Sequence, residues 1–222
     1  MFAGIIESKV LLKSYHYGDQ TLTIQVERPT HFNDLNHGDS IAVNGICLTV
    51  EHFELDSVTF TLGYETLKIL GKHVSSWLSK PFNLERSLQF GSRVHGHFVT
   101  GHVESLVKVT FSESLGENWI LRVLVPAQYA QYCLKKGSMS LHGVSLTINE
   151  KRSISLNCKE TDRKTPKSTI DDFELEVCLI PETQKRTNLV LAEVNDHLCF
   201  EPDSMTKSIV EIVENHLSQS PS

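Results

Sequence analysis

The sequence has 222 residues, of which 40% are hydrophobic and 22% charged, so the chain can bury the core of one large domain or two small ones. Its formal net charge of −6 argues against a nucleic-acid-binding protein, which would normally present a basic face. No apolar run reaches the ~20 residues of a bilayer span, and the start of the chain lacks the basic region of a signal peptide. Five scattered cysteines without a Cys-x-x-Cys pair favour a reducing compartment over a disulfide scaffold or a zinc site.

The predicted elements of the chain are mainly strands. Residues 21–27 alternate apolar and polar side chains, which indicates a half-buried strand. Asn44-Gly45 stands between two apolar runs, and both residue types tolerate the positive φ angles of a two-residue hairpin turn. After Thr66 a short helix over 67–78 is predicted to plug or flank the first sheet. His142-Gly143 predicts a second hairpin turn, and the remaining strands are predicted at 58–62, 107–111, 118–125, 173–179 and 197–201.

The chain repeats itself, which indicates a tandem duplication. Residues 38–50 match residues 136–148, and residues 3–8 match residues 100–105. Two further blocks match downstream, but at a larger spacing, so the second copy contains an insertion between Thr147 and Glu182. The polar stretch 157–172 is the candidate insertion loop. The matched pairs are Ser40 with Ser138, Gly45 with Gly143, Leu48 with Leu146, Thr49 with Thr147, Glu65-Thr66 with Glu182-Thr183, and 82–85 with 198–201. Each copy is therefore predicted to form a closed antiparallel β-barrel.

The end of the chain has a different pattern. From Ser204 onward the apolar residues follow helical spacing and form one stripe, consisting of Met205, Ile209, Ile212, Val213 and Leu217. Such a helix must bury its stripe, either against its own barrel or in a subunit contact. The pattern alone does not choose between the two.

The matched blocks also resemble a known family, the riboflavin synthase α-chains. The resemblance rests on Met-Phe-Ala-Gly-Ile at residues 1–5, on Asn-Leu-Glu-Arg at 83–86 and on His-Gly-His-x-x-x-Gly-His at 95–102. It includes both hairpin blocks and Ile-Pro-Glu-Thr at 180–183, and it covers essentially the whole chain except the insertion.

The family resemblance implies an all-β fold of two pseudo-symmetric six-stranded Greek-key barrels plus a C-terminal helix. It implies a lumazine-binding barrel over 1–95, a second over 96–203 and a trimer-forming helix over 204–222. The implied reaction is the dismutation of two 6,7-dimethyl-8-ribityllumazine molecules to riboflavin and 5-amino-6-(ribitylamino)uracil, without metal or cofactor. The implied assembly is a cytoplasmic homotrimer, with lumazine synthase as a further partner.

Three residues are the catalytic candidates. Cys47 lies where the second copy has Ser145, so it is either a nucleophile or hydrogen-bonding group near C7 of the acceptor lumazine or a small buried thiol. His102 lies where the first copy has Ile5, and its pKa near neutrality suits a general acid–base, although a structural histidine is the alternative. Ser40, at the foot of the first hairpin, is a candidate donor to the pteridine or activator of water.

The resemblance also implies which residues line the two lumazines. Lys136 is assigned to stabilising negative charge on the donor, with a solvated surface lysine as the alternative. A zinc site formed by His95, His97 and His102 is disfavoured because no acidic or thiol partner is near. The substrate-binding candidates are Gly4, Ile5, Ile6, Cys47, Leu48, Thr49, Thr61, Leu62, Gly63, Tyr64, Glu65, Thr66, Gly101, His102, Val103, Lys136, Ser145, Leu146, Thr147, Cys178, Leu179, Ile180, Pro181, Glu182 and Thr183.

Three positions depart from the family pattern. Ala3 replaces a threonine, His142 an aspartate and Cys199 an asparagine. The rival hypothesis is a non-catalytic lumazine- or flavin-binding protein of the same fold. Such proteins usually have a degraded second repeat, whereas here Ser145, Thr147 and residues 180–183 are kept, which favours the enzyme.

Overall fold

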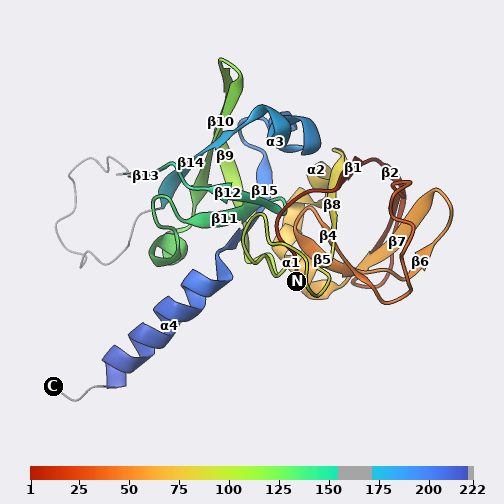
Figure 1. Cartoon of the computed structure of the whole chain (residues 1–222), viewed down its shortest axis with the longest axis horizontal. Coiled ribbons are helices and arrows are strands. Elements are labelled where there is room, and N and C mark those ends of the chain that lie inside the picture. The colour runs from red at the N-terminus through yellow and green to blue at the C-terminus, as the bar shows by residue number, and fades with distance from the viewer. Residues whose placement is uncertain (155–171, 220–222) are drawn as a thin grey trace.

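The structure is a computed structural model that describes residues 1–154 and 172–219. The first half of the chain forms two four-stranded antiparallel sheets (Figure 1). One has the strand order β1-β8-β4-β5, and the other has the order β2-β3-β7-β6. Their bounds are β1 Ser8–Val10, β2 Leu12–Tyr17, β3 Leu22–Glu27, β4 Ser40–Val43, β5 Ile46–Thr49, β6 His52–Phe53, β7 Ser57–Leu62 and β8 Phe82–Arg86.

The second half forms one seven-stranded sheet with the order β12-β11-β15-β9-β10-β14-β13. Its long strands β9 and β10 form the hairpin at the top of Figure 1. The bounds are β9 Ser105–Leu115, β10 Asn118–Val125, β11 Ser138–Leu141, β12 Val144–Thr147, β13 Glu150–Ser153, β14 Phe173–Leu179 and β15 His197–Pro202. The predicted insertion 157–172 falls almost entirely outside the described residues.

The strand order is the same in both halves. Reading β5-β4-β8-β1 and then β2-β3-β7-β6 reproduces the order of the second sheet, provided that β1 and β2 together stand for β9. Leu11 interrupts the first copy between β1 and β2, whereas β9 runs through the equivalent position. The duplication predicted from the sequence is therefore visible in the topology, and the sheets curve as half-barrels.

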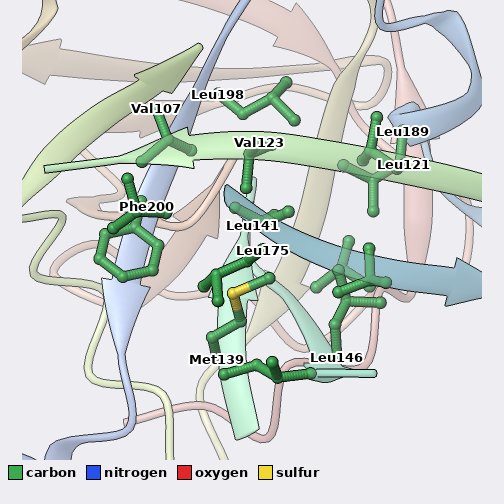
Figure 2. Packing of buried hydrophobic residues seen from close by; sticks show 14 of the residues in the cluster. Val107, Leu121, Val123, Met139, Leu141, Leu146, Leu175, Leu189, Leu198 and Phe200 are labelled. Carbon is green, nitrogen blue, oxygen red and sulfur yellow. The ribbon is translucent and has the colours of Figure 1, made fainter. Parts of the chain in front are cut away.

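Two hydrophobic cores lie inside these sheets. The alternation in residues 21–27 places Leu22, Ile24 and Val26 fully inside, as the pattern predicts. In the second half β14 alternates in the same way. Figure 2 shows Leu175 of this strand among the packed side chains of the second core. The first core includes Leu22, Ile24, Ile41, Leu48, Phe60, Leu62, Leu70, Trp77 and Leu84. The second core includes Val107, Leu121, Val123, Met139, Leu141, Leu146, Leu175, Leu179, Leu198 and Phe200.

Four α-helices complete the described part. The helix predicted over 67–78 is two short helices joined by a 3-10 turn, and its buried Leu70, Trp77 and Leu78 pack on the first core. The predicted terminal helix is present as α4, which projects away from the sheets (Figure 1). The five residues of its predicted apolar stripe are all at least half exposed: Met205, Ile209, Ile212, Val213 and Leu217. The bounds are α1 Tyr64–Leu70, α2 Val74–Leu78, α3 Pro181–Arg186 and α4 Ser204–Gln219.

A buried polar network joins the two halves. The Asn83 side chain donates to the His142 carbonyl at 3.0 Å and to the Asn188 amide oxygen at 2.8 Å. In the first copy Asn44 Oδ1 accepts the backbone N–H of Asn83, and in the second copy His142 Nδ1 accepts that of Cys199, both at 2.9 Å. The two departures at 142 and 199 thus preserve one hydrogen bond. Burial lowers the pKa of His142 to about 3, so the ring is neutral and can accept.

Both hairpin turns predicted from the sequence are confirmed. Asn44-Gly45 has φ angles of 47° and 81°, and His142-Gly143 has 46° and 80°. None of the helices in the described ranges is long and apolar enough to cross a membrane.

Candidate functional site

The two halves exchange a short segment. Residues 2–6 of the first copy lie against the second copy, where the Gly4 carbonyl accepts the backbone N–H of Ser145 at 2.8 Å. Residues 99–103 lie against the first copy, where the Gly101 carbonyl accepts the N–H of Cys47 at 2.8 Å. Phe2 and Val99 form an antiparallel bridge where the segments pass each other. Each half is therefore completed by a segment whose sequence belongs to the other copy.

Glycine is needed at both crossing points. Gly4 has a φ of 74° and Gly101 one of 80°, a region that other residues enter only with strain. A Cβ on Gly4 would lie 2.6 Å from the Cβ of Ser145, and a Cβ on Gly101 would lie 2.6 Å from that of Cys47. The matched Gly4 and Gly101 therefore allow each segment to approach the opposite hairpin closely.

The exchange sorts the predicted substrate residues into two groups. Leu48, Leu62 and Val103 meet on the first core, which brings together residues 47–49, 61–66 and 101–103. Ile6, Leu146 and Leu179 meet in the second core, which brings together residues 4–6, 145–147 and 178–183. The sequence identified these segments, but it did not reveal that 4–6 and 101–103 each serve the other half.

Cys47 faces out of the first core. It is paired with Ala42 across the β4–β5 hairpin, and it packs on a small cluster formed by Phe2, Ala42 and Val99. Ser40 lies on the same face but lines a cavity of about 510 Å³, which Ile5 and Glu85 also line and Cys47 does not. The two catalytic candidates of the first hairpin therefore have different surroundings.

Ser145, the counterpart of Cys47, has a histidine partner. Its Oγ lies 2.7 Å from Nδ1 of His97, and burial lowers the pKa of that imidazole. Nε2 of His97 is buried and has no hydrogen-bond partner among the described residues. The sequence pattern points to His97 only as a member of the disfavoured zinc site, although its position in the family's His-x-x-x-x-His spacing is a signal of a role. The structure adds it to the candidate site.

His102 and Lys136 are exposed at the edges of the two groups. The backbone N–H of His102 donates to Oγ1 of Thr100 at 3.2 Å, and that hydroxyl donates to the buried Glu201 at 2.8 Å, so His102 is linked to this acid through one side chain. Lys136 has a φ of 68° at the position matched by Gly38, and its N–H donates to the Ile148 carbonyl. A lysine held in the left-handed region is strained, and such strain is commonly found at functional positions.

Two buried glutamates hold the exchanged segments. Glu85 on β8 accepts the N–H groups of Ala3 and Gly4, and Glu201 on β15 accepts those of Thr100 and Gly101. Burial raises the pKa of Glu85 to about 7, and the backbone hydrogen bonds oppose this increase. Burial also raises the pKa of Glu201. Within the described ranges, no three histidine, cysteine, aspartate or glutamate side chains are grouped so that they could hold a metal ion.

Comparisons with known proteins agree with this arrangement. The lumazine binding domain family matches residues 3–87 and again residues 100–203. The riboflavin synthase of Escherichia coli K12 is 32% identical over 225 residues, covering 98% of this chain and 94% of that protein. The riboflavin synthases of Mycobacterium tuberculosis H37Rv and Schizosaccharomyces pombe are 31% and 30% identical and cover 97% and 98% of this chain and 99% and 96% of those proteins.

Solved structures support the fold. The structure of LumP complexed with riboflavin superimposes with a TM-score of 0.73 at 21% identity, covering 91% of this chain and 99% of that one. LumP complexed with 6,7-dimethyl-8-(1'-D-ribityl) lumazine gives a TM-score of 0.71, also at 21% identity, and covers 90% of this chain and 98% of that one. With two matched lumazine binding domains and full-length relatives above 30% identity, the chain belongs to the riboflavin synthase family.

Proposed function

We propose that this protein is a riboflavin synthase, a transferase that converts two molecules of 6,7-dimethyl-8-ribityllumazine to riboflavin and 5-amino-6-(ribitylamino)uracil. One lumazine gives up a four-carbon unit and the other receives it, so the atoms balance without any oxidant, reductant or water. The observation that carries the proposal is the pair of complete, matched ligand-lining groups, each with its hairpin, its helix entry and its exchanged segment.

The two lumazines have to play different roles, and the two groups differ where the chemistry needs a difference. One molecule must lose a proton from its acidic 7-methyl group, and the other must be attacked at C7. Ser145 with His97 offers a hydroxyl–imidazole pair in the second group, whereas Cys47 packs on apolar side chains in the first. His102, exposed beside the first group, serves as a general acid–base in addition to the Ser145–His97 pair. Lys136 stabilises negative charge on the molecule in the second group.

The fold and assembly follow from the same proposal. Residues 1–95 and 96–203 form two six-stranded Greek-key barrels, and the identical strand order of the halves supports this division. Residues 204–222 form a homotrimer through the exposed stripe of α4, and the protein associates with lumazine synthase. The active site lies between the first barrel of one subunit and the second barrel of its neighbour. Orienting the two reactants there can remove several kcal/mol of the barrier.

The compartment is the cytoplasm. Cys47, Cys133, Cys178 and Cys199 are all free thiols in the structure, which supports a reducing environment.

The decisive experiment is incubation of the protein with 6,7-dimethyl-8-ribityllumazine while riboflavin formation is followed by its absorbance and fluorescence. Turnover that yields one riboflavin for every two lumazines consumed is expected. Tight binding of both ligands without turnover would instead assign the chain to the non-catalytic lumazine- and flavin-binding proteins, which the similarity to LumP keeps as the second candidate.

The assembly has its own test. A chain that ends at Asp203 should sediment as a monomer, because it lacks the stripe of α4. A double variant, Ile209→Glu with Ile212→Glu, should have the same effect in the full chain, since both side chains are exposed in the single subunit. A trimer that persists in both variants would contradict the role of α4.

A further inference from the structure

Glu85 and Glu201 share the same pair of backbone contacts, and Glu201 also accepts the Thr100 hydroxyl. Oε1 of Glu85 accepts the N–H of Ala3 at 2.7 Å, and Oε2 accepts that of Gly4 at 3.0 Å. Oε1 of Glu201 accepts the N–H of Thr100 at 2.7 Å, and Oε2 accepts that of Gly101 at 3.0 Å. Both side chains are nearly inaccessible, with residue exposures of 4% and 3%. In the described part of the chain neither carboxylate forms an ion pair.

A carboxylate is the side chain that this geometry demands. Two successive backbone N–H groups point at two oxygens, and among side chains of this length a carboxyl group offers an acceptor oxygen at both places. A glutamine of the same shape would turn its NH₂ group toward one of the N–H groups, leaving a buried donor without a partner. The hydrogen bonds from the backbone N–H groups, rather than ion pairs, offset the free-energy cost of burying the two carboxyl groups.

The segments that the glutamates hold serve the opposite half of the molecule. Glu85 belongs to the first copy, but the Gly4 that it binds pairs with Ser145 of the second copy. Ile6, two residues further on, is part of the second core. Glu201 belongs to the second copy, but the Gly101 that it binds pairs with Cys47, and Val103 packs on the first core. Each carboxylate therefore acts across the boundary between the halves.

We propose that Glu85 and Glu201 are crossed positioning residues, each fixing the segment that completes the ligand site of the other repeat. Glu85 thus controls the site formed by 145–147 and 178–183, and Glu201 controls the site formed by 47–49 and 61–66. The inference rests on the proposed function for the identity of the ligand. It goes beyond that function because it makes the two lumazine sites of one chain depend on each other.

The test compares Glu85→Gln and Glu201→Gln in the full-length protein by hydrogen–deuterium exchange, with riboflavin as the added ligand. Peptides covering 178–183 and 61–66 report the two sites separately. At subsaturating riboflavin, Glu85→Gln should reduce ligand-induced protection at 178–183 and leave 61–66 unchanged, and Glu201→Gln should do the reverse. The affinity of the affected site should fall about tenfold, as expected for one lost hydrogen bond to a charged group.

Kinetics separate positioning from catalysis. In each variant kcat/KM should fall about tenfold, while kcat at saturating lumazine recovers to within a few-fold of wild type, because excess substrate refills a weakened site. The matched control is Glu176→Gln, which removes a strand carboxylate whose partners among the described residues are Arg122 and Arg152. Neither reporter peptide should change its protection in the control.

A milder variant covers the case in which a glutamate substitution prevents folding. Thr100→Val removes the 2.8 Å bond from Oγ1 to Glu201 and the 3.2 Å bond that Oγ1 accepts from the His102 N–H, but it keeps the carboxylate. It should weaken ligand protection at 61–66 alone. An uncrossed pattern, in which Glu85→Gln affects 61–66, would overturn the proposal, as would equal changes at both peptides or none at either. If the wild-type protein bound no riboflavin, the proposed function would fail. Faster exchange of residues 2–6 in unliganded Glu85→Gln would still support the role of Glu85 in fixing that segment.

Discussion

Replacing His142 by asparagine tests how this chain tolerates its departure from the family pattern. His142 Nδ1 accepts the Cys199 N–H, as Asn44 Oδ1 accepts the Asn83 N–H in the first copy. An asparagine at 142 has an acceptor of the same kind in the same type of turn, so it should fold equally well at pH 8. Unlike histidine, asparagine has no titratable group.

The expected pH effect follows from the pKa of His142, which burial lowers to about 3 from an ordinary value near 6.5. Between these values the unfolded chain binds a proton that the folded chain refuses, so the wild-type protein loses stability as the pH falls through this window. At pH 5 the loss amounts to about 2 kcal/mol relative to pH 8, since one pKa unit is worth about 1.4 kcal/mol and most of the titration above pH 5 belongs to the unfolded state. His142→Asn should escape this part of the acid destabilisation.

The measurement is urea unfolding at pH 8 and pH 5 at one fixed protein concentration, followed by tryptophan fluorescence. The drop in unfolding free energy between the two pH values should be about 2 kcal/mol smaller in His142→Asn than in wild type. His16→Asn, a substitution on the exposed strand β2, is the control and should leave the wild-type drop unchanged. An equal drop in wild type and His142→Asn would refute the idea that His142 is buried as a neutral ring.

Three further substitutions have clear expected outcomes. Lys136→Gly should relieve the strain of a φ of 68° and raise the unfolding free energy by up to about 1 kcal/mol, while the KM for lumazine rises; thermal unfolding and steady-state kinetics measure the two effects. Gly101→Ala should cost at least about 2 kcal/mol, from the left-handed φ and the close approach to Cys47, and an unchanged urea midpoint would contradict the described crossing. Cys47→Ser should slow turnover more than it weakens ligand binding, and an unaffected rate would return Cys47 to a structural role.

The repeating pattern predicted much of the fold. The alternation over 21–27 and the turns at Asn44 and His142 depend on neighbouring residues only, so they could be predicted without knowing the tertiary contacts. The strands β1, β2, β6 and β13 were not predicted because their sequences carry no clear alternation. β8 was indicated only by the match of residues 82–85 with the predicted strand 197–201. The predicted strand 107–111 is part of a longer strand, β9, whose outer end carries polar residues that pair with β10 beyond the core.

The exchange of segments could not be predicted from the pattern. Residues 3–8 and 100–105 match each other equally well whether each stays with its own copy or crosses to the other. Which copy each segment packs on depends on long-range contacts with one of two chemically similar hairpins. Glu85 and Glu201 could be identified from the sequence only as a matched pair, without a role in holding these segments. The sequence shows His97 as part of the His-Gly-His-x-x-x-Gly-His block at 95–102. Its contact with Ser145, however, depends on how the segment between β8 and His97 folds back, which no local pattern reveals.

The exchanged segments also have a consequence for how the chain is made. A domain that keeps its own strands can fold as soon as it leaves the ribosome, and N-terminal domains generally do so first. Here the first half lacks Gly101 and Val103, which follow it in the chain, while its own Gly4 and Ile6 lack the contacts with Ser145 and the second core until the second half has emerged. The face around Cys47 is therefore expected to stay open in the nascent chain until Gly101 has emerged, and the contact of Gly4 with Ser145 is expected to form after that.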